Sequence, residues 1–392
     1  MTSGALAKHL FSRYEHYRLD HLSPSNCKHE PIFTELLQLV MESKKLMAME
    51  ELGFSIEGRS VNIVKAGTGH KRVLLWSQMH GDESTATLAL MDIFSLFVHG
   101  RADERWIVEL LEEVTLFFIP MLNPDGAERA DRRTAVGIDM NRDARDLATP
   151  EARILREAQH TLKPAFGFNL HDQELSSTGN SRNVTAIALL APAADEKKTK
   201  PPVRVRAMRV AALLARTLGQ FARGHLASYD DAFEPRAFGD NMQRWGTSTV
   251  LIESGQWPND PEKKFIRKLN YVGILTALHA IGNGSYQDAD LDFYTHLPPN
   301  TKRIYDVIIH SVRLHHDYGW THSVDIGLVF DPLLNKDSVR SIATIKDIGD
   351  MSTHGALQSI DGAARPVKPD QLLVNHSLPL NDILDILQLP RA

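Results

Sequence analysis

The feature that most constrains the fold is a series of short apolar runs alternating with longer segments of helical periodicity. Runs rich in β-branched and aromatic residues, typical of strands, span 60–67, 72–76, 114–120, 165–171, 183–190 and 247–254. Segments with apolar residues at helical spacing span 84–100, 151–162, 204–222 and 263–282. Such alternation predicts an α/β fold, with a largely parallel sheet covered by helices on both faces.

The two ends of the chain differ from this pattern. Apolar residues recur at helical spacing over 32–53, so we expect a helical N-terminal extension over residues 1–50. Composition shifts near 282–290, and the short β-like runs "YDVIIHSVRL", "SVDIGLVFD" and "IATIKDIGD" follow. We therefore expect one domain over 1–288 and a small β-rich domain over 289–392.

The overall composition is that of an ordinary soluble protein. A net charge of -5 over 392 residues gives no reason to expect a nucleic-acid partner. The single cysteine, Cys27, excludes an internal disulfide and is typical of a reducing compartment. The N-terminus has no signal-like apolar core, and no apolar run is long enough to span a membrane. We expect a cytoplasmic location and no membrane partner.

Candidate metal ligands lie at the ends of two predicted strands. His80 and Glu83 follow the run 72–76, and their three-residue spacing lets both side chains reach a common point. His171 ends the run 165–171. In open α/β sheets, sites gather at the carboxyl ends of the strands. Two histidines and a glutamate form a ligand set typical of hydrolytic Zn²⁺, although His80 and Glu83 alone would also suit a surface turn.

Other polar residues follow neighbouring runs. The turn sequence "NPDG" (123–126) follows the run 114–120, and the stretch after it holds the charged and amide residues Arg132, Arg133, Asp139, Asn141 and Arg142. Glu253 lies at the end of the run 247–254, after four apolar or β-branched residues. Partial desolvation would raise the pKa of its carboxyl group, which suits proton transfer.

Taken together, the ordered motifs "MHGDE", "NPDG", "GIDMNRD", "NLHDQ" and "LIESG" resemble those of the zinc carboxypeptidases of the M14 metallopeptidase family. The resemblance covers residues of about 50 to 285. It implies a mixed, largely parallel sheet flanked by helices, and a hydrolase that acts on peptides.

The resemblance also implies a role for each matching residue. His80, Glu83 and His171 would bind one Zn²⁺ per chain, and Asp139 would orient the first histidine. Asn141 and Arg142 would bind the terminal carboxylate of the substrate. Glu253 would act as the general base.

Two further assignments stay open between alternatives. Arg132 matches the arginine that stabilises the oxyanion, and we prefer it to its neighbour Arg133, which is the other candidate for contacting the substrate. Tyr229 is the nearest candidate for the tyrosine that covers the substrate, although a packing role would also suit it. The loop 191–204 is either a solvated surface excursion or a lid.

The expected reaction is hydrolysis of an amide next to a free carboxylate, releasing a C-terminal amino acid from a peptide. The alternative is an N-acyl amino acid deacylase of the aspartoacylase or succinylglutamate desuccinylase type, which uses nearly the same residues. A third reading is a binding module with the fold but no catalysis. The substrate and the oligomeric state stay open.

Overall fold

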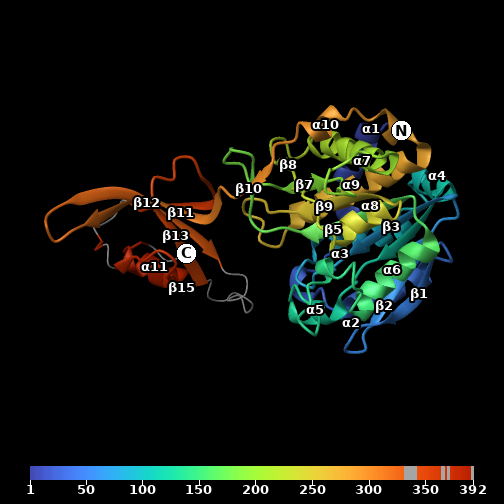
Figure 1. Ribbon diagram of the computed structural model, residues 1–392, viewed down its shortest axis with the longest axis horizontal. Coiled ribbons are helices and arrows are strands. Elements are labelled where there is room, and N and C mark those ends of the chain that lie inside the picture. The colour runs from blue at the N-terminus through green and yellow to red at the C-terminus, as the bar shows by residue number, and fades with distance from the viewer. Residues whose placement is uncertain (331–341, 363–366, 369–370, 390–392) are drawn as a thin grey trace. The chain divides into compact units, whose positions relative to one another are not determined.

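The computed structural model describes residues 1–330, 342–362, 367–368 and 371–389. The chain divides into two units (Figure 1). The first unit comprises 1–173, 186–255 and 262–299, and the second comprises 174–185, 256–261 and 300–392.

Within the described residues, a mixed eight-stranded sheet forms the centre of the first unit, in the order β1-β2-β4-β3-β5-β9-β7-β8. The strands are β1 (Met47–Phe54), β2 (Ser60–Ala66), β3 (Lys71–Ser77), β4 (Val114–Ile119), β5 (Phe166–Asp172), β7 (Ile187–Leu190), β8 (Leu226–Ser228) and β9 (Ser248–Ser254). The central strands β4, β3, β5 and β9 are parallel, whereas β1, β2 and β7 pair in antiparallel fashion. The predicted α/β class with a mixed, largely parallel sheet is confirmed.

Helices cover both faces of this sheet (Figure 1). They are α1 (Ser3–Arg13), α2 (His29–Glu42), α3 (Thr85–His99), α4 (Arg105–Glu113), α5 (Pro124–Arg129), α6 (Pro150–Leu162), α7 (Pro202–Leu218), α8 (Phe238–Arg244), α9 (Lys264–Asn283) and α10 (Asp292–Thr295). On one face, Leu74 and Trp76 of β3 pack in a buried cluster with Leu155 of α6 and Met242 of α8. Helix α9 packs against both α3 and α7, and the three form a second layer. Burial on both faces explains why the central strands are apolar throughout.

The expected helix over 32–53 is wrong in its second half. Helix α2 ends at Glu42, and Lys44 and Lys45 take positive φ values of 51° and 72°. The chain then forms β1, which pairs with β2 at the edge of the sheet. The helical extension therefore does not reach residue 50, because sheet pairing overrides the helical propensity of 47–54.

A buried carboxylate ties the N-terminal segment to the helical layer. Asp92 of α3 accepts hydrogen bonds from the Tyr14 hydroxyl at 2.8 Å and from the Leu19 amide at 2.9 Å. It also accepts from Arg267 Nε of α9 at 2.7 Å, and Arg267 donates in turn to Leu22 O at 2.8 Å. Since Asp92 is fully buried, this network is part of the core of the first unit.

The second unit is built on a five-stranded sheet of order β14-β11-β12-β13-β15. Its main elements are β11 (Ile304–His315), β12 (Thr321–Phe330), β13 (Ile342–Gly349), β14 (Gly355–Asp361), β15 (Ser377–Pro379) and α11 (Leu380–Ile386). Val307, Ile326, Ile345 and Leu384 lie in its apolar core. The three predicted β-like runs correspond to β11, β12 and β13, while Asp331 lies outside the described residues.

The division between the units differs from the expected boundary at residue 288. Residues 289–299 lie in the first unit, where α10 packs on α7 and the Tyr294 hydroxyl accepts a hydrogen bond from Ala191 N at 2.9 Å. Two internal segments join the second unit, in which β6 (Ser177–Thr178) pairs with β10 (Asn300–Thr301). Across the described residues, no helix has the length and apolarity needed to cross a membrane.

Candidate metal centre

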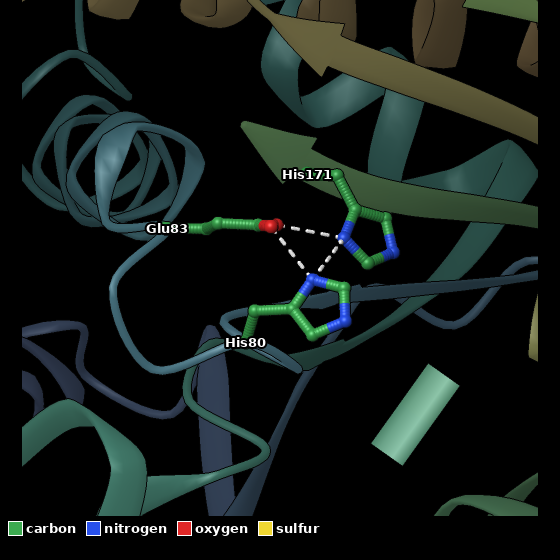
Figure 2. A group of neighbouring side chains, drawn as sticks. All are labelled: His80, Glu83 and His171. Carbon is green, nitrogen blue, oxygen red and sulfur yellow. Dashed lines mark hydrogen bonds and ion pairs between the residues drawn. The ribbon is translucent and has the colours of Figure 1, made fainter. Parts of the chain in front are cut away.

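Three buried side chains converge at the carboxyl end of the central strands: His80, Glu83 and His171 (Figure 2). One donor atom of each lies within 4.8 Å of the others. Glu83 Oε1 is 2.6 Å from His80 Nδ1, and Glu83 Oε2 is 2.7 Å from His171 Nδ1. The two Nδ1 atoms are 3.2 Å apart. The predicted ligand residues are therefore brought together.

A close backbone contact positions His80 and Glu83. They lie in the turn between β3 and α3, where a Cβ on Gly81 would come within 2.0 Å of the Gly126 carbonyl carbon. Only glycine permits this approach. Asn123 fixes the facing turn, since its Oδ1 accepts from Gly126 N at 3.0 Å and its Nδ2 donates to Met79 O at 3.2 Å. The "NPDG" motif thus supports the turn that carries two of the ligands.

The sheet register places His171 beside Glu253. In the parallel pair β5–β9, His171 lies opposite Glu253. Glu253 is only 7% exposed. Burial, together with the charges of Glu83 and Asp172, raises the pKa of the Glu253 carboxyl group well above its usual value. This is the environment expected from its place after an apolar run.

The pKa of each of the three converging groups depends on the charge of at least one of the others. Burial alone would raise the pKa of Glu83, but the charges of His80 and His171 and their hydrogen bonds lower it below its usual value. Burial lowers the pKa of His171. The donor set fits a divalent cation, because two imidazole nitrogens and a carboxylate point at one buried spot and leave further coordination positions open.

Asp139 and Arg132 flank this donor set. His80 Nε2 is 3.0 Å from Asp139 Oδ1, a contact that leaves His80 Nδ1 facing Glu83 and His171. Arg132 Nη1 lies 3.0 Å from His80 Nδ1 and 3.1 Å from Glu83 Oε1, and its Nη2 donates to Asp139 Oδ2 at 3.1 Å.

The neighbouring arginine and the candidate tyrosine make other contacts. Arg133 is directed toward its own loop, where its Nη1 donates to Gly137 O at 3.0 Å. Tyr229 is half-buried, and its backbone N donates to Leu189 O at 2.9 Å. Among the described residues, the hydrogen-bond partners of His80, Glu83 and His171 do not include Arg133.

The predicted carboxylate-binding pair is built into a short 3₁₀ turn. Asp139 caps this turn by accepting from Asn141 N at 2.9 Å. Asn141 Oδ1 accepts from Phe238 N at 3.0 Å, and Arg142 Nη1 donates to the Asn141 carbonyl at 2.8 Å. The Arg142 side chain remains 41% exposed, so its guanidinium is accessible to a ligand.

Sequence reasoning missed Asp172 and Lys263. The Asp172 amide donates to Glu83 Oε2 at 3.0 Å, and its carboxylate accepts from Lys263 Nζ at 2.9 Å and from the Thr85 hydroxyl at 2.5 Å. A charged residue directly after the predicted ligand His171 was a signal for Asp172. Nothing in the local sequence pointed to Lys263, because its contact with Asp172 depends on the fold.

Comparison with known proteins agrees with this fold. The family model described as zinc carboxypeptidase matches residues 33–212. Carboxypeptidase 2 of Trichophyton rubrum is 26% identical over 147 residues, which cover 35% of this chain and 27% of that protein. Carboxypeptidase A2 of Rattus norvegicus is 28% identical over 129 residues, which cover 29% of this chain and 31% of that protein. The matched regions therefore span less than a third of these relatives' length.

Two solved structures share the fold. A metallo-carboxypeptidase from Burkholderia cenocepacia aligns with a TM-score of 0.52 and 15% identity, over 64% of this chain and 68% of that chain. Bovine thrombin-activatable fibrinolysis inhibitor, in complex with tick carboxypeptidase inhibitor, aligns with a TM-score of 0.53 and 11% identity. The alignment covers 69% of this chain and 99% of that chain. The fold is that of the metallocarboxypeptidases. Residues 33–212 of the chain are similar to the zinc carboxypeptidase family.

Proposed function

We propose that the protein is a zinc-dependent hydrolase that releases a C-terminal amino acid from a peptide. The observation that carries this proposal is the pairing of a buried His-Glu-His donor set with a buried glutamate on the adjacent strand. Three protein ligands with further positions open are typical of catalytic zinc and not of structural zinc. The family match over 33–212 includes all three ligand residues.

His80, Glu83 and His171 would hold the Zn²⁺ ion, which supplies Lewis-acid polarisation of the substrate carbonyl and a lowered pKa for a reacting water. Glu253 takes the proton of the attacking water at its carboxylate and later gives it to the leaving amine. Its burial suits this role, because a raised pKa brings the carboxyl group closer to the pH at which it can both accept and donate.

The remaining residues bind and orient the substrate. Arg132 stabilises the negative charge that develops on the carbonyl oxygen, since its guanidinium already lies at the ligand set. Arg142 and Asn141 bind the free carboxylate, which selects the last peptide bond of a chain. Asp139 holds His80 in the orientation that presents Nδ1.

The proposal is tested by the variant Glu253→Gln. We expect zinc to remain bound, measured by mass spectrometry, while turnover falls by about 100-fold or more because the proton acceptor is lost. Glu109→Gln, at an exposed position in α4, is the matched control and should retain full activity. Near-normal turnover of Glu253→Gln would contradict the assignment.

The substrate class is tested separately. The wild-type protein is incubated with a peptide library and with a panel of N-acyl amino acids, with and without a chelator. Release of C-terminal amino acids that stops on chelation is the expected result. Cleavage of the N-acyl amino acids alone would favour a deacylase, and a zinc-free protein that hydrolyses neither panel would favour a binding module.

A further inference from the structure

Glu234 lies between two arginines beside the proposed carboxylate-binding pair. Its Oε1 accepts from Arg236 Nε at 2.9 Å and its Oε2 from Arg236 Nη2 at 2.7 Å, which forms a bidentate pair. Glu234 Oε2 is also 3.5 Å from Arg142 Nε. The side chains of Glu234 and Arg142 are 28% and 41% exposed, so this triad borders solvent.

Backbone contacts fix the segment 234–238 against the turn that carries Arg142. Besides the bond from Phe238 N to Asn141 Oδ1, Ala144 N donates to Arg236 O at 3.0 Å. The Glu234 amide is held as well, since it donates to Asp240 Oδ1 at 3.1 Å. The position of Glu234 beside Arg142 is therefore set by the fold and does not depend on a single flexible ion pair.

These contacts determine which edge of the Arg142 guanidinium is available. Within the described part of the chain, Arg142 Nε faces Glu234 and one Nη1 hydrogen is used by the Asn141 carbonyl. A guanidinium has five N–H donors, so the remaining donors of Nη1 and Nη2 stay available at the outer end. That end can bind a carboxylate through two parallel hydrogen bonds.

Glu234 is suited to act as a permanent anion. The hydrogen bonds from Arg236 lower the pKa of Glu234 to about 2, so its carboxylate stays ionised through the neutral range. Both oxygens of Glu234 already accept hydrogen bonds from Arg236. Glu234 therefore orients the Nε side of Arg142 and leaves the Nη edge of Arg142 to a ligand.

We propose that Glu234, held by Arg236, is a positioning residue that presents the outer edge of Arg142 to the terminal carboxylate of the substrate. The inference rests on the proposed function, because it assumes that Arg142 binds that carboxylate. An opposite role can be imagined, in which Glu234 competes with the substrate for Arg142. The two roles predict opposite changes in KM.

The kinetic test uses Glu234→Gln, which keeps the size of the side chain and removes its charge. With the best peptide from the library, we expect KM to rise about fivefold while kcat stays within about twofold of wild type, as for a charge pair that acts in substrate binding. Arg236→Gln should raise KM in the same direction. The double variant Glu234→Gln with Arg236→Gln should raise KM by less than the two single variants combined, because both residues act through one ion pair. Glu109→Gln serves as the control.

A binding test gives a readout that does not depend on turnover. Calorimetry is used to measure the affinity of the zinc-loaded protein for free leucine, lysine and glutamate, with their carboxamides as controls. Wild type should bind at least one of the acids more tightly than its carboxamide, and Glu234→Gln should reduce this preference.

The outcomes separate the two proposals. An unchanged KM in Glu234→Gln, or a lower one, would overturn the positioning role while leaving the hydrolase intact. A fall in both kcat and the melting temperature of Glu234→Gln would also overturn the positioning role, since the residue would then be only structural. If the wild-type protein neither hydrolyses peptides nor prefers carboxylates, the proposed function fails and this inference fails with it.

Discussion

At the scale of single residues, the two arginines of "ADRRTA" show how a structure separates neighbours that a sequence cannot. Arg132 and Arg133 are chemically identical and adjacent, so only their directions distinguish them. Arg132 reaches the His-Glu-His set and Asp139, whereas Arg133 donates to the carbonyl of Gly137. The choice between them follows from the path of the loop, which depends on contacts far away in the sequence.

This difference gives a kinetic prediction. Arg132→Gln should lower kcat by about 100-fold, because a donor placed near the developing oxyanion is lost. Arg133→Gln should leave kcat within about twofold, and it is the matched control because it removes the same charge one residue away. Equal losses in the two variants, measured under saturating substrate, would show that Arg132 has no special place in the reaction.

Asp240 offers a prediction about pH and stability. It is 8% exposed, and burial together with the charge of Glu234 raises the pKa of its carboxyl group to about 6. The folded state holds this proton more tightly than the unfolded state does. Wild type therefore loses stability as the pH rises from 3.8, the ordinary pKa of an aspartate, through 6, the pKa in the folded state. Asp240→Asn should remove this loss, because asparagine carries no charge and its side-chain oxygen can still accept a hydrogen bond from the backbone N–H of Glu234.

We therefore expect Asp240→Asn to be more stable than wild type at pH 7.5, by about 1–3 kcal/mol, and nearly equal to it at pH 4. The free energy of unfolding is measured with urea at both pH values. A constant difference between the two proteins at both pH values would argue against a raised pKa in the folded state.

At the scale of elements, the sequence was most informative about the site where a polar residue follows the end of an apolar, strand-like run. The apolar runs that became β3, β5 and β9 were visible from composition and length, so their carboxyl ends could be located and the ligand candidates with them. The helix expected over 32–53 failed because "MAMEELGF" consists largely of good helix formers, and its pairing with β2 is not a local property.

The contacts that sequence reasoning missed share a common cause. Asp172 contacts Lys263, and Arg142 contacts Glu234, across about ninety positions of sequence. Neither pair lies within one element or follows a spacing rule, so periodicity and motif arguments could not join them. Such contacts follow from the order in which strands are placed in the sheet.

The network that joins the segment 14–22 to α3 and α9 gives a prediction at this scale. Arg267→Met should destabilise the first unit by about 3–5 kcal/mol, because Asp92 would remain buried without its cation. The double variant Asp92→Leu with Arg267→Met should recover part of this loss, since no charge is then left unpaired. Urea unfolding measures both values. A double variant no more stable than the single one would indicate that the hydrogen bonds to Tyr14 and Leu19 matter more than the charge.

At the scale of the whole molecule, a metal bound at the site would link it to the stability of the fold. Glu83 and Glu253 are buried carboxylates close to one another, an arrangement that a bound cation would favour electrostatically. Removal of Zn²⁺ with a chelator should lower the melting temperature, and added Zn²⁺ should restore it. Free zinc at a hundred times its dissociation constant would contribute about 2.7 kcal/mol.

The control for this prediction is His171→Ala, which removes one ligand. Its melting temperature should no longer respond to zinc. If wild type and His171→Ala respond equally, the metal that stabilises the protein binds elsewhere.

The second unit is assembled from three stretches of chain, and this limits how the protein can be divided for study or exchanged between relatives. A fragment ending at Pro299 would retain Ser177 but lose Thr301, whose hydroxyl lies 2.8 Å from the Ser177 hydroxyl. A fragment starting at Asn300 would lack β6, the partner of β10. A single cut therefore leaves both products with unmatched edges. We expect each fragment to be less soluble than the full chain, and a transplant of this unit must carry all three stretches.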